Sequence, residues 1–385
     1  RDLHRLIRRQ RQMCIRDSSN MDAPLVSVII LNWNGKHFLR NCLSSVLNSD
    51  YPNFEIIFVD NASIDGSVEY VLKNFGFDRR LKVIKNNKNL GYTGGNNVGI
   101  KYAKGKYVVL LNNDTKVEPG WLRELVKVME LNPDVGIAQS KLLLLNNPRL
   151  IDCAGGFIDP FGYGYERGHL EKDKGQYDKV DNIFYSKGAS IIIRREILKK
   201  VGLFDEDFFM YFDEADLCWR VWLAGYRVVL CPTSIVYHIS EGVTGSLEGK
   251  IRRFYYITRN SLTSMIKNYS FKSLIKYLPI RIFLDLFRLI ILIINEVYIL
   301  KAKTTKSKIP ILFLEYKAVY SALPKAYLHF LLKMLPKSIA SHRSIQRIRK
   351  LQDKTIFQNT LPILSKSMKR KRVDLSLKLL GISVQ

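Results

Sequence analysis

The sequence contains 385 residues and carries a formal net charge of +26, from 61 Lys and Arg residues against 35 Asp and Glu residues. This length allows two domains with a sizeable core, and the charge suggests nucleic acid or an anionic membrane as a partner. The distribution of charge argues against nucleic acid. Residues 21–245 contain 27 basic and 27 acidic residues, whereas residues 246–385 contain 28 and six. The neutral segment lacks a basic motif interleaved with aromatic residues, so we expect no nucleic-acid partner.

The N-terminal segment and the cysteines bear on the cellular compartment. Residues 1–20 precede Met21 and lack the apolar run of a signal peptide, so we expect a disordered or non-native extension there. The chain has five cysteines and no CxxC pair. An odd number without such pairs favours reduced thiols in a cytoplasm over a disulfide framework or a structural zinc site.

The first part of the chain alternates between strand and helix patterns. Short apolar runs predict buried strands at residues 25–32, 54–59, 81–84 and 107–111, and helical stripes predict helices at 36–47, 67–74 and 97–103. Residues 89–97 (NLGYTGGNN) are expected to form a Gly/Asn-rich loop. Apolar strands that alternate with helices indicate an α/β fold with a parallel sheet covered on both faces. Ligands of such sheets bind beyond the carboxyl ends of the strands.

The pattern is mixed after Pro119. We expect helices at residues 121–130 and 214–225, a β-rich segment within 183–193, and two short strands at 226–230 and 234–237. The composition shifts towards Lys, Leu and Ile after Glu241, which places a boundary near residue 245. The predicted domains are therefore 21–245 and a helical, membrane-associating region at 246–385.

Residues 278–300 have the length of a membrane span, but four charged residues interrupt them. Arg281, Asp285, Arg288 and Glu296 lie within one narrow arc of a helix, which predicts an amphipathic helix with a wide apolar face. Such a helix packs on the core of its own protein or lies in a membrane interface, and the basic surroundings favour the membrane. The basic run at residues 369–372 is either solvated or in contact with anionic lipid.

Polar side chains cluster where three predicted strands end. Asp60 can accept hydrogen bonds from a nucleobase or a ribose, while Asp65 either shares this role or caps the next helix. Asp114 is a candidate ligand for a hard cation that would neutralise a diphosphate. His238 follows another short strand and could be a second ligand, although a lone histidine is more often structural.

Three carboxylates fall within four positions at the start of the predicted helix 214–225. Acidic residues in a first turn are favoured by the helix dipole. Clustering of Asp213, Glu214 and Asp216 can also raise one pKa and produce a general base.

Eight motifs occur in a characteristic order: SVIILNWNG, VDNASIDGS, NLGYTGGNN, LLNNDT, KGASIIIRRE, GLFDEDFFMYFDEADLCWR, LAGYR and VYH. Together they resemble the family 2 glycosyltransferases, the GT-A-fold group that includes many rhamnosyltransferase-like enzymes. The resemblance extends from about Leu25 to Gly242. It implies a nucleotide-binding, Rossmann-like mixed sheet flanked by helices, followed here by the helical, basic and amphipathic C-terminal region.

The resemblance implies roles for individual positions. Asp114 matches the metal ligand of the family's DxD motif, whose first acid is replaced by Asn112, and His238 matches a late histidine that would complete the site. Glu214 sits where the family has its catalytic base. The alternatives for this base are Asp213 and Asp216. The residues expected to bind the acceptor are Gly188, Ala189 and Trp219. The residues expected to bind the nucleotide sugar are Asn32, Asn34, Asp60, Asn61, Asp65, Gly94, Gly95, Asn96, Asn97 and Asn113.

The resemblance also implies an activity. We expect an inverting glycosyltransferase that uses Mg²⁺ or Mn²⁺ and acts on a polysaccharide or lipid-linked acceptor at the inner face of the cell membrane. dTDP-rhamnose is the first candidate donor, and UDP- or GDP-sugars are alternatives. An inactive sugar-nucleotide-binding relative and a nucleotidyltransferase are the competing hypotheses, and the second lacks the Lys/Arg-rich triphosphate loop that it needs.

Overall fold

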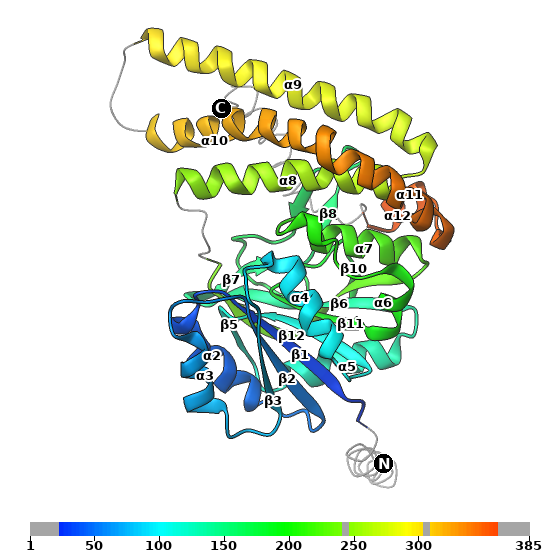
Figure 1. Ribbon diagram of the computed structural model, residues 1–385. Coiled ribbons are helices and arrows are strands. Elements are labelled where there is room, and N and C mark those ends of the chain that lie inside the picture. Colours follow the sequence, from blue (N-terminus) through cyan, green and yellow to red (C-terminus); the bar gives the residue numbers. More distant parts are fainter. Residues whose placement is uncertain (1–22, 241–245, 303–308, 361–385) are drawn as a thin grey trace.

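The structure is a computed structural model that describes residues 23–240, 246–302 and 309–360 (Figure 1). For residues 295–302 and 309–318 it describes the backbone alone. The predicted extension at residues 1–20 and the basic run at 369–372 lie outside the described residues.

One mixed sheet forms the body of the molecule. Four parallel strands lie in the order β4-β1-β2-β3, and β11 pairs antiparallel with β4 and continues the sheet to β6, β12 and β10. The strands are β1 (Val26–Asn32), β2 (Phe54–Asp60), β3 (Leu81–Lys85), β4 (Tyr107–Asn112), β5 (Thr115–Val117), β6 (Val135–Leu144), β7 (Asn147–Cys153), β8 (Gly156–Ile158), β9 (Gly164–Glu166), β10 (Asp181–Asn182), β11 (Ser190–Arg194) and β12 (Arg227–His238). The four predicted parallel strands are confirmed, and the whole is the mixed α/β sheet that the resemblance implied.

Helices cover both faces of this sheet. α2 (Lys36–Leu47), α3 (Ser67–Phe75) and α5 (Trp121–Leu131) bury their apolar stripes on one face. α4 (Gly91–Tyr102), α6 (Arg195–Val201) and α7 (Asp213–Leu223) bury theirs on the other. Because β1 and β4 are sandwiched between these layers, their side chains are apolar along nearly their whole length.

The predicted loop at residues 89–97 is wrong, because α4 begins at Gly91. Its glycines allow the helix to lie directly on the sheet: a Cβ on Gly95 would overlap Leu31, and one on Gly99 would overlap Ile29. Glycine and asparagine disfavour helices in isolation, and here tertiary packing overrides that propensity.

The second half of the sheet differs from the sequence prediction in two further respects. The two short strands expected at 226–230 and 234–237 are one strand, β12, with an irregularity between Cys231 and Ile235. The ten-residue strand β6 was not predicted. All but one of its residues are buried, so it lacks the alternating pattern that marks a half-exposed strand.

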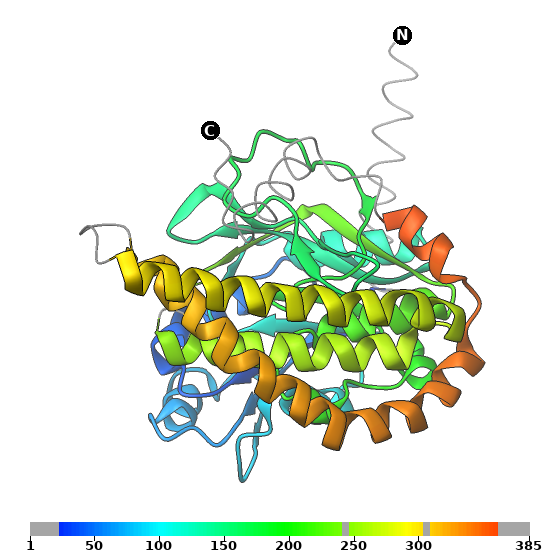
Figure 2. The ribbon, with the colours of Figure 1, turned by 90° about the horizontal axis from the view of Figure 1, so that it is seen from above.

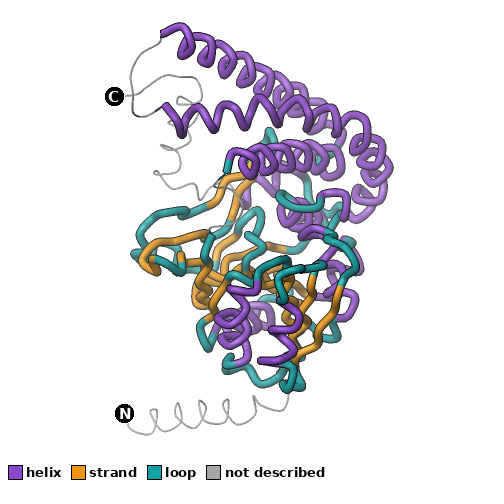
Figure 3. The backbone as a smooth tube through the Cα atoms, turned by 60° about the vertical axis from the view of Figure 1, so that its left-hand side comes forward, coloured by secondary structure: helices purple, strands orange, loops and turns teal. Residues whose placement is uncertain are grey.

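The C-terminal region forms a helical layer over one side of the sheet domain (Figures 1 and 3). It consists of α8 (Leu247–Asn268), α9 (Phe271–Ala302), α10 (Ile309–His329), the π-helical turn η2 (Phe330–Met334), α11 (Leu335–Ile348) and α12 (Asp353–Thr360). Seen from above, α8, α9 and α10 run across the sheet domain (Figure 2). The last three turns of α8 are buried. No helix among the described residues is long and apolar enough to cross a membrane. The division at residue 245 remains a prediction.

Candidate functional site

A network of amides lies at the carboxyl ends of β1, β2 and β4. Asn32 is fully buried and donates through Nδ2 to Asp60 Oδ1 at 3.1 Å and to Ser63 Oγ at 3.1 Å. Its Oδ1 accepts from Nδ2 of Asn113 at 2.7 Å. Asn34 has φ of 52° and shares this turn through its backbone N–H, which donates to Ser63 Oγ. The structure therefore brings Asn32, Asp60 and Asn113 together at three adjacent strand ends.

Two other residues predicted for the nucleotide sugar are engaged within the protein. Asp65 Oδ2 accepts the backbone N–H of Lys36, and its Oδ1 accepts from the N–H and hydroxyl of Ser67. Slight burial acts to raise the pKa of Asp65, but the hydrogen bonds from Ser67 and Lys36 outweigh it and lower this pKa. Asn61 is buried and bonds to Asn89, Gly91, Asn86 and Leu90, so it fixes the start of α4. Both residues organise the backbone around the site.

The predicted residues on α4 have structural contacts of the same kind. Asn97 donates to Phe204 O at 2.9 Å and accepts the N–H of Phe204 at 3.1 Å, and Asn96 bonds to Tyr92 O. A Cβ on Gly94 would meet Leu90 at 2.8 Å, which leaves no open space beside this glycine. Gly95 also has no open space beside it, because it packs against Leu31 of β1. The geometry therefore argues against direct ligand contact by Gly95 and Asn97.

The two predicted metal ligands lie side by side. Asp114 follows β4 and His238 ends β12, and Nε2 of His238 is 3.3 Å from Oδ1 of Asp114. Apart from this contact, the buried Oδ1 has no hydrogen-bond partner among the described residues. A carboxylate and an imidazole suit Mg²⁺ or Mn²⁺, and an ion here would take the place of the proton on Nε2 of His238. Among the described residues, no group of three His, Cys, Asp or Glu side chains is arranged to bind a metal.

Asp152, at the end of β7, is the main residue that sequence reasoning missed. It is fully buried, and its Oδ2 is 2.9 Å from Nδ1 of His238. Lys187 Nζ and Ser240 Oγ donate to its Oδ1 at 3.0 and 2.8 Å. Burial acts to raise the pKa of Asp152, but the bonds from His238 and Lys187 hold this pKa well below its usual range. Burial also lowers the pKa of His238, and the carboxylates of Asp114 and Asp152 more than offset this and raise it to about 9. A carboxylate on Nδ1 fixes the ring so that Nε2 points at Asp114.

The expected catalytic base lies at the start of α7. Glu214 Oε1 accepts the backbone N–H of Gly188 at 3.1 Å, and Tyr92 OH donates to the carbonyl of Gly188 at 3.1 Å. Asp213 is buried, and neither of its carboxyl oxygens has a hydrogen-bond partner among the described residues. Burial raises the pKa of Glu214; burial and then the charge of Glu214 raise that of Asp213 well above its ordinary value. Two acids with raised pKa values at the start of α7 are candidates for proton transfer.

Two predicted site residues point elsewhere. Asp216 is 1% exposed and contacts Arg220 Nε at 3.0 Å, Lys267 Nζ at 3.1 Å and Asn268 Nδ2 at 2.9 Å. Burial acts to raise the pKa of Asp216, but Lys267 and Arg220 lower it to about 2. Trp219 is fully buried in an aromatic cluster with Phe184 and Tyr269. Since five residues turn a helix by about 500°, Trp219 faces away from Glu214. Asp216 pairs α7 with α8, and Trp219 belongs to the hydrophobic core, so the predictions that they are site residues are wrong.

The loop before α7 is held by the C-terminal layer. Phe209, Tyr211 and Phe212 have φ of 64°, 64° and 66°, a left-handed conformation that is unusual for aromatic residues. Asn260 of α8 donates through Nδ2 to the carbonyls of Phe208, Met210 and Tyr211 at 3.1, 3.0 and 2.7 Å. Helix α8 therefore stabilises the strained segment that delivers Asp213 and Glu214.

The segment at residues 187–189 joins the acid pair to the metal candidates. Lys187 contacts Asp152, Gly188 contacts Glu214, and the carbonyl of Ala189 accepts the N–H of Asn112 at 3.1 Å. Asn112 precedes Asp114 by two residues. Three residues of one segment thus place both acidic clusters at the same end of the sheet, and this arrangement suits a reaction in which a base and a diphosphate flank one carbon atom.

Comparison with known proteins identifies the family. The model of glycosyl transferase family 2 matches residues 27–216, from β1 to the first turn of α7, including both Asp114 and Glu214. The chain belongs to glycosyl transferase family 2. This glycosyl transferase family 2 chain is 33% identical over 232 residues to "Uncharacterized protein y4gI" of Sinorhizobium fredii. The aligned region covers 58% of the chain and 25% of the relative. It is 30% identical over 224 residues to "O-antigen biosynthesis protein RfbC" of Myxococcus xanthus, covering 56% of the chain and 17% of the relative. The chain thus spans a quarter or less of the length of these two relatives.

A solved structure supports the fold. The mannosyltransferase PcManGT from Pyrobaculum calidifontis, in complex with GDP-Man and Mn²⁺, aligns with a TM-score of 0.53 at 18% identity. The alignment covers 86% of this chain and 87% of that chain. The architecture of this family 2 chain is accordingly of the GT-A type.

Proposed function

We propose that the chain is an inverting glycosyltransferase that moves a sugar from a nucleoside-diphosphate sugar to a hydroxyl group of a glycan. The observation that carries this proposal is the connection of the Asp213–Glu214 pair to the Asp114–His238 pair through residues 187–189. A general base and a cation site at one strand end are the two groups that displacement of a nucleoside diphosphate requires.

Glu214 is the proposed base. Its carboxylate takes the proton from the acceptor hydroxyl, and that oxygen attacks the anomeric carbon from the face opposite the diphosphate, so the configuration inverts. The N–H of Gly188 holds one carboxylate oxygen and orients the other, and Tyr92 holds the carbonyl of Gly188. Asp213 is buried beside the base, and burial together with the charge of Glu214 holds the pKa of Asp213 high.

Asp114 and His238 are the proposed ligands of Mg²⁺ or Mn²⁺. When bound, the ion supplies positive charge against the diphosphate leaving group. The buried Oδ1 of Asp114, which has no hydrogen-bond partner besides His238 among the described residues, supports this role, and so does the Mn²⁺ in the complex of PcManGT. Asp152 positions His238 from behind, as a carboxylate often does for a metal-binding imidazole.

The donor and acceptor are narrower proposals. dTDP-rhamnose remains the first candidate donor from the sequence resemblance, while the GDP-Man in PcManGT favours testing a GDP-sugar beside it. The name of the Myxococcus relative supports a cell-surface polysaccharide or its lipid-linked precursor as the acceptor. We place the enzyme in the cytoplasm, peripheral on the inner face of the cell membrane, with residues 21–245 as the transferase domain.

The competing reading is an inactive sugar-nucleotide-binding relative. The observation that favours it is Asn112, which stands where the family motif has an acid and leaves a cation site with only two protein ligands. Both hypotheses predict that the chain binds a sugar nucleotide, and only the first predicts that it transfers the sugar.

Thermal unfolding with a panel of dTDP-, UDP- and GDP-sugars, with and without Mn²⁺, tests both readings. We expect one donor to raise Tm in a Mn²⁺-dependent manner and to be hydrolysed slowly without acceptor. Asp114→Asn should abolish the Mn²⁺-dependent part, while Glu69→Gln on the exposed side of α3 should retain it. Stabilisation without hydrolysis or transfer would favour the inactive relative, and no stabilisation by any donor would overturn the proposal.

A further inference from the structure

Helix α9 has its charged side chains turned inward. Arg281 and Asp285 are each 2% exposed, and Arg288, one turn further on, is largely covered. The sequence predicted these residues on one arc of an amphipathic helix. A charged arc usually faces water, so the packing of α9 is inverted relative to a surface helix.

A network of polar contacts fixes this orientation. Arg281 Nε lies 2.7 Å from Asp285 Oδ2, and Arg281 Nη1 donates to the carbonyl of Phe161 at 3.0 Å. Tyr163 and Tyr327 each donate to Asp285 at 2.7 Å. The Arg281–Asp285 pair lies within α9, but a rotation that buried the other face would break its bonds to Phe161, Tyr163 and Tyr327. Buried polar groups that lose such partners cost free energy. The apolar face of α9 is therefore held outward by the protein itself.

The outward face is continuous and apolar. From residue 279 to residue 294, every residue of α9 that is clearly exposed is apolar. Phe283 is 64% exposed, and its neighbours along the stripe continue the same surface in both directions. The large exposed side chains of this face are Phe271, Ile275, Ile280, Ile282, Phe283, Leu286, Phe287, Ile290, Ile293 and Ile294. A contiguous apolar surface of this kind marks an interaction site.

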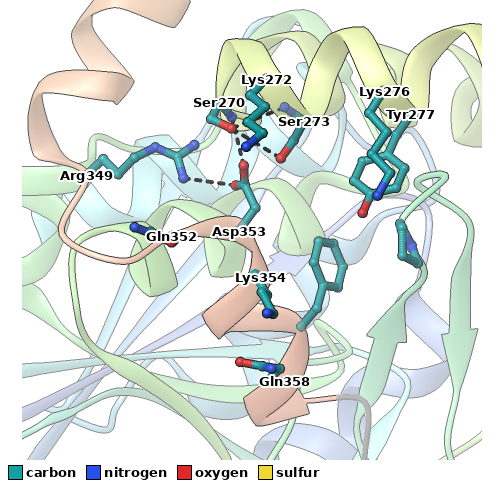
Figure 4. A pocket seen from close by; sticks show the side chains of 12 residues that line it. Ser270, Lys272, Ser273, Lys276, Tyr277, Arg349, Gln352, Asp353, Lys354 and Gln358 are labelled. Atoms are coloured by element: carbon teal, nitrogen blue, oxygen red, sulfur yellow. Dashed lines mark hydrogen bonds and ion pairs between the residues drawn. The ribbon is translucent and has the colours of Figure 1, made fainter.

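Positive charge borders the N-terminal end of this face. Lys272, Lys276 and Lys354 line a pocket of about 1230 Å³ between the first turns of α9 and helix α12 (Figure 4). None of the three has an ion pair with a described residue, whereas Arg349 in the same pocket pairs with Asp353 at 2.9 Å. No predicted site residue lines this pocket.

We propose that the outward face of α9 docks onto an anionic lipid bilayer, with the helix lying in the membrane interface and Lys272, Lys276 and Lys354 contacting lipid phosphates. This inference rests on the membrane location proposed above and identifies the surface that would bind the membrane. Charge selects the occupant. Residues 246–385 carry 28 basic and six acidic residues, so a second copy would repel this region while anionic lipid attracts it. A helix with one apolar face and basic flanks lies in an interface.

Flotation of the full chain with vesicles of phosphatidylglycerol and phosphatidylcholine tests the proposal. We expect binding to vesicles that contain phosphatidylglycerol, weaker binding to pure phosphatidylcholine, and release by salt. Phe283→Glu together with Leu286→Glu should lower partitioning by about 100-fold, because each apolar side chain contributes on the order of tenfold when buried. Replacement of Lys272, Lys276 and Lys354 by Gln should lower it by about fivefold for each lysine.

A matched pair of variants controls for altered stability. Phe77→Glu with Leu131→Glu changes two side chains of the same types, 81% and 71% exposed, on the sheet domain, and should leave flotation unchanged. Binding of the donor sugar nucleotide should be retained in both double variants, which separates failure of docking from failure of the proposed chemistry. Equal flotation of the two double variants would overturn the proposal. The proposal would also be overturned if the wild-type chain were a dimer, the α9 double variant were a monomer, and neither protein bound vesicles.

Discussion

The first turn of α7 carries three carboxyl groups that face two different regions of the molecule. Asp213 and Glu214 face the carboxyl end of the sheet, where no cation of the described part of the chain pairs with them, and their pKa values are raised. Asp216, two residues later, faces α8 and is paired with Lys267 and Arg220, and its pKa falls to about 2. Carboxyl groups on one helical turn thus have raised pKa values on one side and a lowered pKa on the other. The partner surface decides which.

The largest effect is expected from Glu214→Gln, which tests Glu214 as the general base. Loss of a general base should lower kcat by about 10³-fold, within the usual range for such a group. The amide can still accept from Gly188, and it removes a charge that is costly to keep near Asp213, so Tm should not fall. Steady-state kinetics and thermal unfolding measure both quantities. Activity within a few-fold of wild type would remove Glu214 from the mechanism.

Gly188→Ala tests the geometry around the base without touching a carboxylate. A Cβ at this position would overlap Glu214 Oε1 and Tyr92 OH. Displacement of the base by this contact should lower kcat by about 100-fold and change the affinity for the donor little. Gly120→Ala is the control, since a Cβ there meets the movable end of Arg123. Wild-type kcat in Gly188→Ala would show that this contact does not position the base.

Asp216→Asn tests the structural side of the turn. The substitution removes the carboxylate that pairs with Arg220 and leaves Lys267 with Asp205 alone, and it should cost about 3 kcal/mol of unfolding free energy. The folded pKa of Asp216 is lowered to about 2, so its contribution is complete above the unfolded value of about 3.9 and is lost as pH falls through about 2. Denaturant unfolding from pH 7 to pH 2 should show the gap between wild type and variant closing. A constant gap would contradict this account.

The smallest effect concerns the pH dependence of the reaction. Glu214 must be ionised to accept a proton, and its folded pKa is raised by burial. Activity should therefore be lost, as pH falls, at a higher pH than the ordinary glutamate value of about 4.3. The acid limb of the kcat–pH profile measures this directly, and donor binding at the same pH values separates it from loss of substrate. A limb at or below about 4.3 would show that the base is not buried Glu214.

The sequence predicted most of the parallel half of the sheet. The strands β1, β2, β3 and β4 are short apolar runs, and a run buried on both faces leaves a plain signal. The start of α4 was missed because Gly91 to Asn97 read locally as a loop, and only contact with β1 explains a glycine-rich helix. Strand β6 was missed because it is buried along almost its whole length and lies in a segment without clear alternation.

The candidate site was predicted in part. Asn32, Asp60, Asn113, Asp114 and His238 could be named because they follow or end predicted strands, and strand ends in such sheets converge. Glu214 could be named from the cluster of three carboxylates at a helix start and from the family resemblance. Asp152 could not, since a single Asp at the end of β7 gives no sign that it will meet His238. Asp216 was an alternative base because it belongs to the acidic cluster, and the resemblance assigned Trp219 to the acceptor. The turn of the helix directs Asp216 to α8 and Trp219 to the core.

The amino-acid sequence alone determined which side chains are chemically capable: acids at strand ends, an apolar stripe with four charges on helix α9, and an excess of basic residues after residue 245. Tertiary structure decided which way those side chains face. It paired Asp216 and left Asp213 unpaired, and it turned Arg281 inward and Phe283 outward. Periodicity fixes the angle between two residues on a helix, but the rotation of that helix against its neighbours depends on contacts from distant segments such as Tyr163 and Tyr327.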